Sequence, residues 1–170
     1  MSNFKFCPKC AGELKVEGNG HNQVPVCRKC GFKFYQNSKP TSSALIVNGE
    51  DKVLLLKRAI KPHFGKWDIP GGFLENGENP VVGLKREAKE ELGIDVKPLE
   101  ILTICVDNYG LEEDDFYTFN VFYKCKISDG KIVLDQENSE FKWFSKNEIP
   151  WKELAFNNTT LALKALFNKK

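Results

Sequence analysis

Three glutamates near the middle of the chain are spaced so that one helix would carry them on a single face. Glu87, Glu90 and Glu91 stand at positions i, i+3 and i+4, which are neighbours on a helix surface. Carboxylate oxygens are the ligands that hard divalent cations prefer, and such cations bind phosphates and lower the pKa of a bound water. The spacing therefore favours a site that cuts a phosphoanhydride, although a solvated acidic helix face would show the same pattern.

Four of the six cysteines form a second group of ligand-type residues near the N-terminus. They occur as two Cys-x-x-Cys pairs, Cys7 with Cys10 and Cys27 with Cys30. Each pair is a turn that aims two thiolates at one ion, so two turns predict a four-cysteine zinc site. Four thiolates close the coordination shell, and the zinc would be structural. Disulfides or a redox pair are the alternatives.

The glutamates need a helix, and the sequence marks both of its ends. Asn79 is a good N-cap and Pro80 is tolerated in the first turn, whereas Gly93 is typical of the residue that follows a C-terminus. Apolar residues recur at helical spacing opposite the glutamates and predict the buried stripe: Val81, Leu84, Ala88 and Leu92.

Strand-like runs flank this helix on both sides. A hairpin is expected at Asn48-Gly49, and a short strand ends at Pro70-Gly71-Gly72. Two short helices are expected after residue 147, the clearer one at residues 160–167. The order of strands, helix, strands and helix predicts an α/β fold with a mixed sheet. The longer runs lie at residues 44–47, 52–57, 96–106, 116–127 and 141–144.

Composition limits the class of protein. The chain has 170 residues, 41% of them hydrophobic and 28% charged, which suits one soluble domain with a small appendage. The net charge of +2, with both signs interspersed, gives no reason to expect a nucleic acid or a membrane as partner. The cysteine-rich residues 1–38 are expected to form a zinc ribbon, and residues 39–170 the main domain. No secretory signal is evident, so a cytoplasmic location is expected.

Residues 72–94 resemble the Nudix box. Its fixed positions are matched by Gly72, Glu78, Arg86-Glu87-Ala88, Glu90-Glu91 and Gly93-Ile94, and residues 67–72 are similar to the strand that leads into that box. The resemblance spans most of residues 41–167. It implies an α/β/α sandwich that binds Mg²⁺ or Mn²⁺ and hydrolyses the pyrophosphate of a nucleoside diphosphate linked to another group.

The resemblance also implies roles for single residues. Glu87, Glu90 and Glu91 would be metal ligands through their side chains, with Glu87 and Glu90 counted among the catalytic residues. Gly71 would be a ligand through its backbone carbonyl.

Three other positions of the box support these ligands. Arg86 would orient the carboxylates, and we count it as catalytic. Glu78 would brace the loop, while Gly72 and Gly93 are structural positions.

Two further roles are less closely tied to the box. The general base is a box glutamate or one of two later carboxylates, Glu137 and Glu140; we favour Glu140 because it lies nearer the expected strand. Arg58, at a strand end, matches a position that holds a substrate phosphate in the family. Ordinary surface charge is the alternative for all three residues.

The substrate is left open. A zinc ribbon followed by a Nudix box resembles NADH pyrophosphatases, but residues 94–110 lack their Ser-Gln-Pro-Trp-Pro-Phe-Pro marker. ADP-ribose, NADH and dinucleoside polyphosphates remain candidates, and Tyr109 points weakly to the last. Two other functions stay open: nucleic-acid binding through basic and aromatic residues of the ribbon, and a regulator built on a Nudix scaffold. A homodimer would also fit the family.

Overall fold

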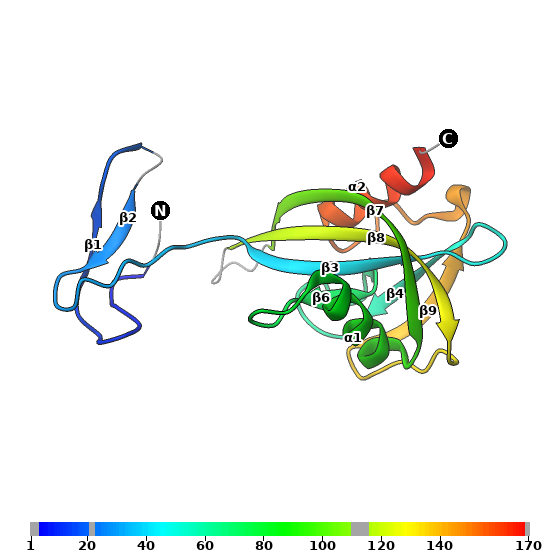
Figure 1. Cartoon of the computed structure of the whole chain (residues 1–170). Helices are drawn as coiled ribbons and strands as arrows, with labels where there is room; N and C mark the ends of the chain where they lie inside the picture. The colour runs from blue at the N-terminus through cyan, green and yellow to red at the C-terminus, as the bar shows by residue number, and fades with distance from the viewer. Residues whose placement is uncertain (1–3, 21–22, 110–115, 169–170) are drawn as a thin grey trace. The chain divides into compact units, whose positions relative to one another are not determined.

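The described part of the chain falls into two units. The computed structural model describes residues 4–20, 23–109 and 116–168, divided between Met1–Asn37 and Ser38–Lys170 (Figure 1). In the first unit, β1 (Leu14–Glu17) and β2 (Val24–Cys27) form an antiparallel pair. Tight turns begin at Cys7 and Cys27, whose carbonyls accept the N–H groups of Ala11 and Gly31. Each turn brings the two cysteines of one Cys-x-x-Cys pair close together.

The second unit contains two sheets, one of which is mixed, as the order of elements predicted. Four strands lie in the order β6-β3-β8-β7 and three in the order β5-β4-β9. Only the β3–β8 pair is parallel among the described strands. The bounds are β3 Lys39–Ile46, β4 Val53–Arg58, β5 Trp67–Asp68, β6 Gly71–Phe73, β7 Asp95–Asn108, β8 Tyr117–Asp129 and β9 Asn138–Phe144.

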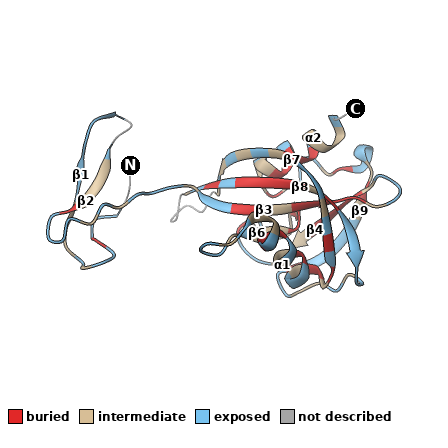
Figure 2. Cartoon of the chain, viewed as in Figure 1, coloured by how far each residue is buried: buried red, intermediate tan, exposed pale blue. Residues whose placement is uncertain are grey.

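The central strands β3 and β4 are buried on both faces (Figure 2). Successive side chains of a strand point to opposite faces. Ala44 and Ile46 therefore pack into one hydrophobic cluster with α1 (Pro80–Leu92), while Leu45 packs into another with α2 (Asn157–Asn168). Strands covered on both faces read as unbroken apolar runs, which explains the continuous run of leucines in β4. The arrangement confirms the α/β/α sandwich.

Local hydrogen bonds fix the ends of α1 where the sequence predicted them. The Asn79 side chain accepts the N–H of Val81 at 2.9 Å. Gly93 has a φ of 69° and donates its N–H to Lys89. The helix buries Leu84, together with Ala88 and Leu92, so the glutamates lie outside this apolar stripe.

Element boundaries differ from expectation by a few residues in several places. The strand expected at residues 44–47 is β3, which begins at Lys39 because its pairing with β8 starts there. The strand β9 begins at Asn138, three residues earlier than expected, because it pairs with β4 as far as Arg58. The first tail helix is a short 3₁₀ turn, η2 (Lys146–Glu148), and α2 begins at Asn157. None of the described helices is both long and apolar enough to cross a bilayer.

Candidate active site

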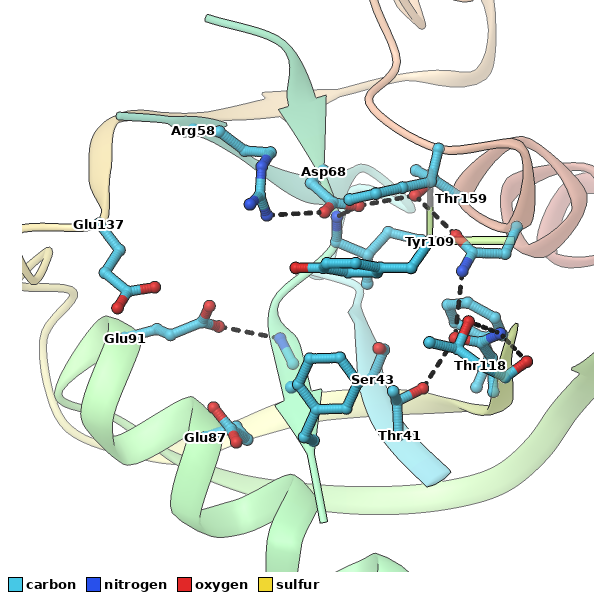
Figure 3. Close-up of a pocket in the computed structure, with 18 of the residues that line it drawn as sticks. Thr41, Ser43, Arg58, Asp68, Glu87, Glu91, Tyr109, Thr118, Glu137 and Thr159 are labelled. Carbon is cyan, nitrogen blue, oxygen red and sulfur yellow. Dashed lines mark hydrogen bonds and ion pairs between the residues drawn. The ribbon is translucent and has the colours of Figure 1, made fainter. Parts of the chain in front are cut away.

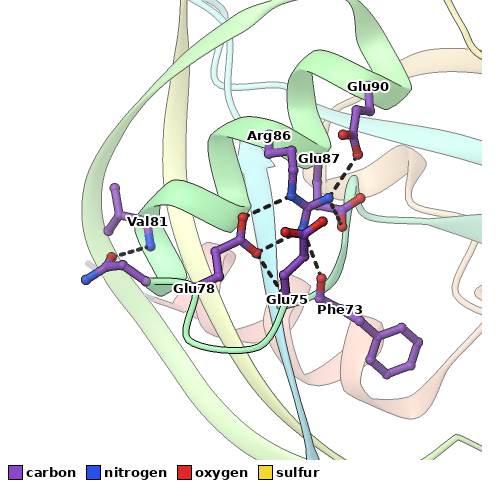
Figure 4. A network of polar contacts seen from close by, with 8 residues as sticks. Phe73, Glu75, Glu78, Val81, Arg86, Glu87 and Glu90 are labelled. Atoms are coloured by element: carbon purple, nitrogen blue, oxygen red, sulfur yellow. Dashed lines mark hydrogen bonds and ion pairs between the residues drawn. The ribbon is translucent and has the colours of Figure 1, made fainter.

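Arg86 lies at the centre of the polar network on α1 (Figure 4). Its Nε and Nη2 atoms donate to the two carboxylate oxygens of Glu78 at 2.9 and 3.0 Å. Its Nη1 atom donates to Glu87 at 2.8 Å and Glu90 at 2.9 Å, and Nη2 also reaches the Phe73 carbonyl at 3.0 Å. All five N–H groups of the guanidinium are thereby engaged, so one arginine ties the loop before α1 to two of the three glutamates.

Two glycines of β6 allow the backbone to approach the glutamates closely. The Gly71 N–H donates to Oε2 of Glu91 at 2.8 Å. A Cβ atom on Gly72 would lie 2.5 Å from Oε1 of Glu87. Gly71 has a φ of 144°, and a Cβ there would collide with the Ser42 carbonyl. A larger residue at Gly72 would push β6 away from α1, and a larger residue at Gly71 would push it away from β3.

The glutamate cluster is short of positive charge. Burial raises the pKa of Glu91 well above its ordinary value, and the Gly71 N–H offsets this only in part. Burial also raises the pKa of Glu87, against the opposing effect of Arg86. Glu87, Glu90 and Glu91 offer carboxylate oxygens, the kind of ligand that Mg²⁺ or Mn²⁺ prefers. The residues present therefore fit a divalent cation, which would supply the missing charge.

A pocket of about 410 Å³ opens beside these glutamates (Figure 3). One end is lined by carboxylates: Glu87, Glu90, Glu91, Asp135 and Glu137. Arg58 of β4 and Asp68 of β5 also line the pocket, and Figure 3 places them on the side away from Glu87. A cavity of this size suits a small-molecule ligand, and its opposite charges suit one that carries both phosphate and bound metal.

Aromatic rings form another side of the pocket, which we call the aromatic wall: Phe73, Tyr109 and Phe156. The rings of Tyr109 and Phe156 are stacked, with centroids 5.4 Å apart and an interplanar angle of 19°. Phe73 meets Tyr109 edge to face at 5.4 Å. Flat apolar rings of this kind bind other flat rings by stacking.

Residues distant in sequence form the polar floor of the pocket. Asn120 accepts a hydrogen bond from Thr41 at 2.7 Å and from the Asn158 side chain at 3.1 Å. The Asn120 amide donates to Thr118 at 2.9 Å. The sequence patterns singled out none of these residues, nor Asp68, Thr159 and Phe156. Asp68 lies just before the Nudix box, but the side chains that pair with it lie elsewhere in the chain.

The structure separates the two later carboxylates that the sequence offered as bases. Glu137 precedes β9 and lines the pocket. Glu140 lies within β9 opposite Lys57, whose Nζ is 3.4 Å from its carboxylate, and it is not among the pocket-lining residues. Arg58 lines the pocket as well, and its Nε donates to the Pro62 carbonyl at 2.8 Å.

The four N-terminal cysteines come together in the first unit. Their sulfur atoms all lie within 4.8 Å of one another, with Cys10 3.5 Å from Cys27 and 3.4 Å from Cys30. Sulfur atoms on a tetrahedral zinc with bonds of about 2.3 Å would be roughly 3.8 Å apart. The cluster therefore has the size of a zinc site, whereas Cys105 and Cys125 lie in the second unit.

Gly71 and Gly72 of β6 face the glutamate cluster of α1, and the sheets of this unit lie between two helices. This combination of fold and site indicates the class of protein. The NUDIX domain family model matches residues 38–164, and the chain belongs to the Nudix family. The crystal structure of a NUDIX hydrolase from Nitrosomonas europaea is similar, with a TM-score of 0.79 and 32% identity. The match covers 98% of this chain and 92% of that one.

Several similar proteins carry the name NAD-capped RNA hydrolase. NudC of Pseudomonas aeruginosa is 28% identical over 86% of this chain and 49% of its own length. The protein ndx-9 of Caenorhabditis elegans is 28% identical over 87% of this chain and 38% of its own length. The chain thus spans half or less of the length of these two relatives.

Replacing Arg86 tests the network directly. A lysine cannot make the five hydrogen bonds of the guanidinium, so Arg86→Lys leaves Glu78 and Glu87 without full partners. We expect a loss of about 1–3 kcal/mol in the free energy of unfolding, measured by urea denaturation without divalent metal. Lys85→Gln, on an exposed position of the same helix, is the control and should change little. Equal unfolding midpoints for both variants would contradict the role of Arg86.

Proposed function

We propose that the protein hydrolyses the pyrophosphate bond of a nucleoside diphosphate linked to another group, with a divalent cation as cofactor. The observation that carries the proposal is the pocket, where a carboxylate cluster, an arginine and an aromatic wall border one cavity. Membership of the Nudix family and the names of similar proteins support the reaction class.

The carboxylates of Glu87, Glu90 and Glu91 and the carbonyl of Gly71 would hold Mg²⁺ or Mn²⁺. A cation bound there would neutralise phosphate charge and lower the pKa of a bound water. Arg86 keeps Glu87 and Glu90 in fixed positions, so the ligands need little rearrangement when a cation binds.

Glu137 is our proposed general base. It borders the carboxylate end of the pocket, and its exposed side chain has no hydrogen-bond partner among the described residues. A base must lie within reach of the attacking water. Glu137 would accept a proton from water as the water oxygen attacks phosphorus and the bond to the bridging oxygen breaks. Glu140, which the sequence favoured, is paired with Lys57 instead.

Arg58 and the aromatic wall would bind the rest of the substrate. A guanidinium offers paired donors that match phosphate oxygens, so Arg58 is assigned to a phosphate. The rings of Tyr109 and Phe73 would stack on the nucleobase. This arrangement would place the pyrophosphate between Arg58 and the metal ligands, where the water attacks.

The reaction class is tested with purified protein, Mg²⁺ or Mn²⁺, and a panel of substrates. The panel holds ADP-ribose, NADH, dinucleoside polyphosphates, nucleotide sugars, nucleoside triphosphates and NAD-capped RNA. We expect metal-dependent release of nucleoside monophosphate from at least one diphosphate-linked compound, followed by chromatography. Glu90→Gln removes a metal-ligand charge and should lower kcat by a factor of about 100 or more. If no panel member yields a metal-dependent product, the proposed function is wrong.

The identity of the base is tested by two matched substitutions. Glu137→Gln and Glu140→Gln each remove one carboxylate from the same segment of chain without changing its size. We expect Glu137→Gln to lower kcat by about 100-fold, within the usual range for a general base, while Glu140→Gln keeps kcat within about twofold. The comparison uses the best substrate of the panel at saturating concentration. A larger loss in Glu140→Gln would restore the expectation drawn from the sequence.

The four cysteines would bind one structural zinc ion. Metal analysis of the purified protein should find about one zinc per chain. Cys27→Ser should lower the zinc content and unfold the first unit, because so small a unit depends on the metal; amide NMR spectra report both units separately. Cys105→Ser, the same change outside the cluster, should keep the zinc. Full zinc content in Cys27→Ser would rule out this ligand set.

A further inference from the structure

Asp68 is a partly buried carboxylate in the pocket that the proposed mechanism does not use. Its Oδ1 atom accepts two hydrogen bonds, one from the Thr159 hydroxyl at 2.6 Å and one from the Ile69 N–H at 2.9 Å. Its Oδ2 atom faces Nη1 of Arg58 at 3.4 Å (Figure 3). The two oxygens therefore have different roles, because one is anchored to the fold and the other faces the arginine.

Arg58 is held from two directions and keeps one donor group for the pocket. Its Nε atom donates to the Pro62 carbonyl at 2.8 Å, and its Nη1 atom faces Asp68. Its Nη2 atom has no hydrogen-bond partner among residues 4–20, 23–109 and 116–168. The ring of Phe156 lies against the guanidinium, 5.3 Å from Cζ. Because the side chain is fixed on three sides, little rotamer freedom remains to be lost when an anion binds.

We propose that Asp68 is a positioning residue, anchored to α2 through Thr159, that holds Arg58 so that its Nη2 edge meets a substrate phosphate. This assignment rests on the proposed function of Arg58 as a phosphate ligand. Asp68 itself does not touch the substrate. Thr159 of α2 and Phe156, which directly precedes this helix, thereby become part of the anion site.

A simpler possibility is that Asp68 only repels anions, and the two possibilities predict opposite results. If Asp68 merely competes for Arg58, Asp68→Asn removes a negative charge from the pocket and tightens phosphate binding. If Asp68 positions Arg58, the same substitution weakens binding. The Thr159 hydroxyl and the Ile69 N–H both require an oxygen at the Oδ1 position, so the asparagine NH₂ group would face the donors of Arg58. Two donors cannot pair, and the arginine would be displaced.

The test is a double-mutant cycle that measures the dissociation constant of inorganic phosphate by ³¹P NMR, with the whole 170-residue chain and Mg²⁺. We expect Asp68→Asn and Arg58→Ala each to weaken binding by about tenfold, the scale of one hydrogen bond to a charged group. The double variant should bind no more weakly than Arg58→Ala alone, because Asp68 acts only through Arg58. Asp129→Asn, the same change at an exposed site outside the pocket, should match the wild type.

Thr159 provides a second test that does not depend on the folding of Asp68→Asn. Thr159→Val keeps the shape of the side chain but removes the hydroxyl, so it should weaken phosphate binding by a smaller factor. Thr159→Ser keeps the hydroxyl and should restore it. With a hydrolysed substrate, both Asp68→Asn and Thr159→Val should raise KM while kcat changes little, because the metal ligands and the base are untouched.

The outcomes separate this inference from the proposed function. Tighter or unchanged phosphate binding in Asp68→Asn, additive losses in the cycle, or wild-type binding in Thr159→Val would each overturn the role of Asp68. If the cycle behaves as expected but no panel substrate is hydrolysed, the anion site stands and the proposed function fails. If substrates are hydrolysed and KM is unchanged in Asp68→Asn, the proposed function stands and the role of Asp68 fails.

Discussion

The mutual repulsion of carboxylates on one helix face is the constraint on which the rest of the site depends. On an exposed helix, like charges one turn apart cost only a few tenths of a kcal/mol. Partial burial makes this repulsion stronger, because two unit charges about 5 Å apart at an effective dielectric constant near 20 repel by roughly 3 kcal/mol. Glu87 and Glu91 are both partly buried, and burial raises the pKa of each. A protein that keeps such a cluster needs nearby positive charge, and the surroundings of α1 supply only part of it.

The shortage of positive charge around α1 explains several otherwise separate features of the sequence. Arg86 bonds to the carboxylates of two of the glutamates, while the carboxylate of the third accepts a hydrogen bond only from the N–H of Gly71 among the described residues. The glycines of β6 are needed because a side chain there would occupy the space of Glu87 or of the β3 backbone. The Asn79 cap and the Gly93 terminus fix the length of the helix that presents the charges. The remaining deficit favours a divalent cation as the missing partner.

The features predicted from the sequence are those decided by residues close together in the chain. The ends of α1 depend on caps within a few residues of each end, and the glutamate face depends on helical spacing alone. The polar floor joins Thr41 to Asn120 and the anion site joins Asp68 to Thr159, separated by 79 and 91 residues. Such contacts arise from the parallel pairing of β3 with β8 and from the packing of α2, which no local pattern encodes. The sequence likewise could not show which of Glu137 and Glu140 lines the pocket. The start of β9 decides this, and it is set by the pairing of β9 with β4.

The division of charge within the pocket also limits what can bind there. The carboxylate end would repel a free phosphate, whereas Arg58, near the aromatic wall, would attract one. On the proposed function, a ligand that satisfies both ends carries at least two linked phosphates, one near the arginine and one associated with a cation at the glutamates, and a flat ring that reaches Tyr109 or Phe73. A nucleoside monophosphate can satisfy one end but not both. A linked diphosphate satisfies both and has its bridging oxygen between the two ends, which is where hydrolysis would cleave it.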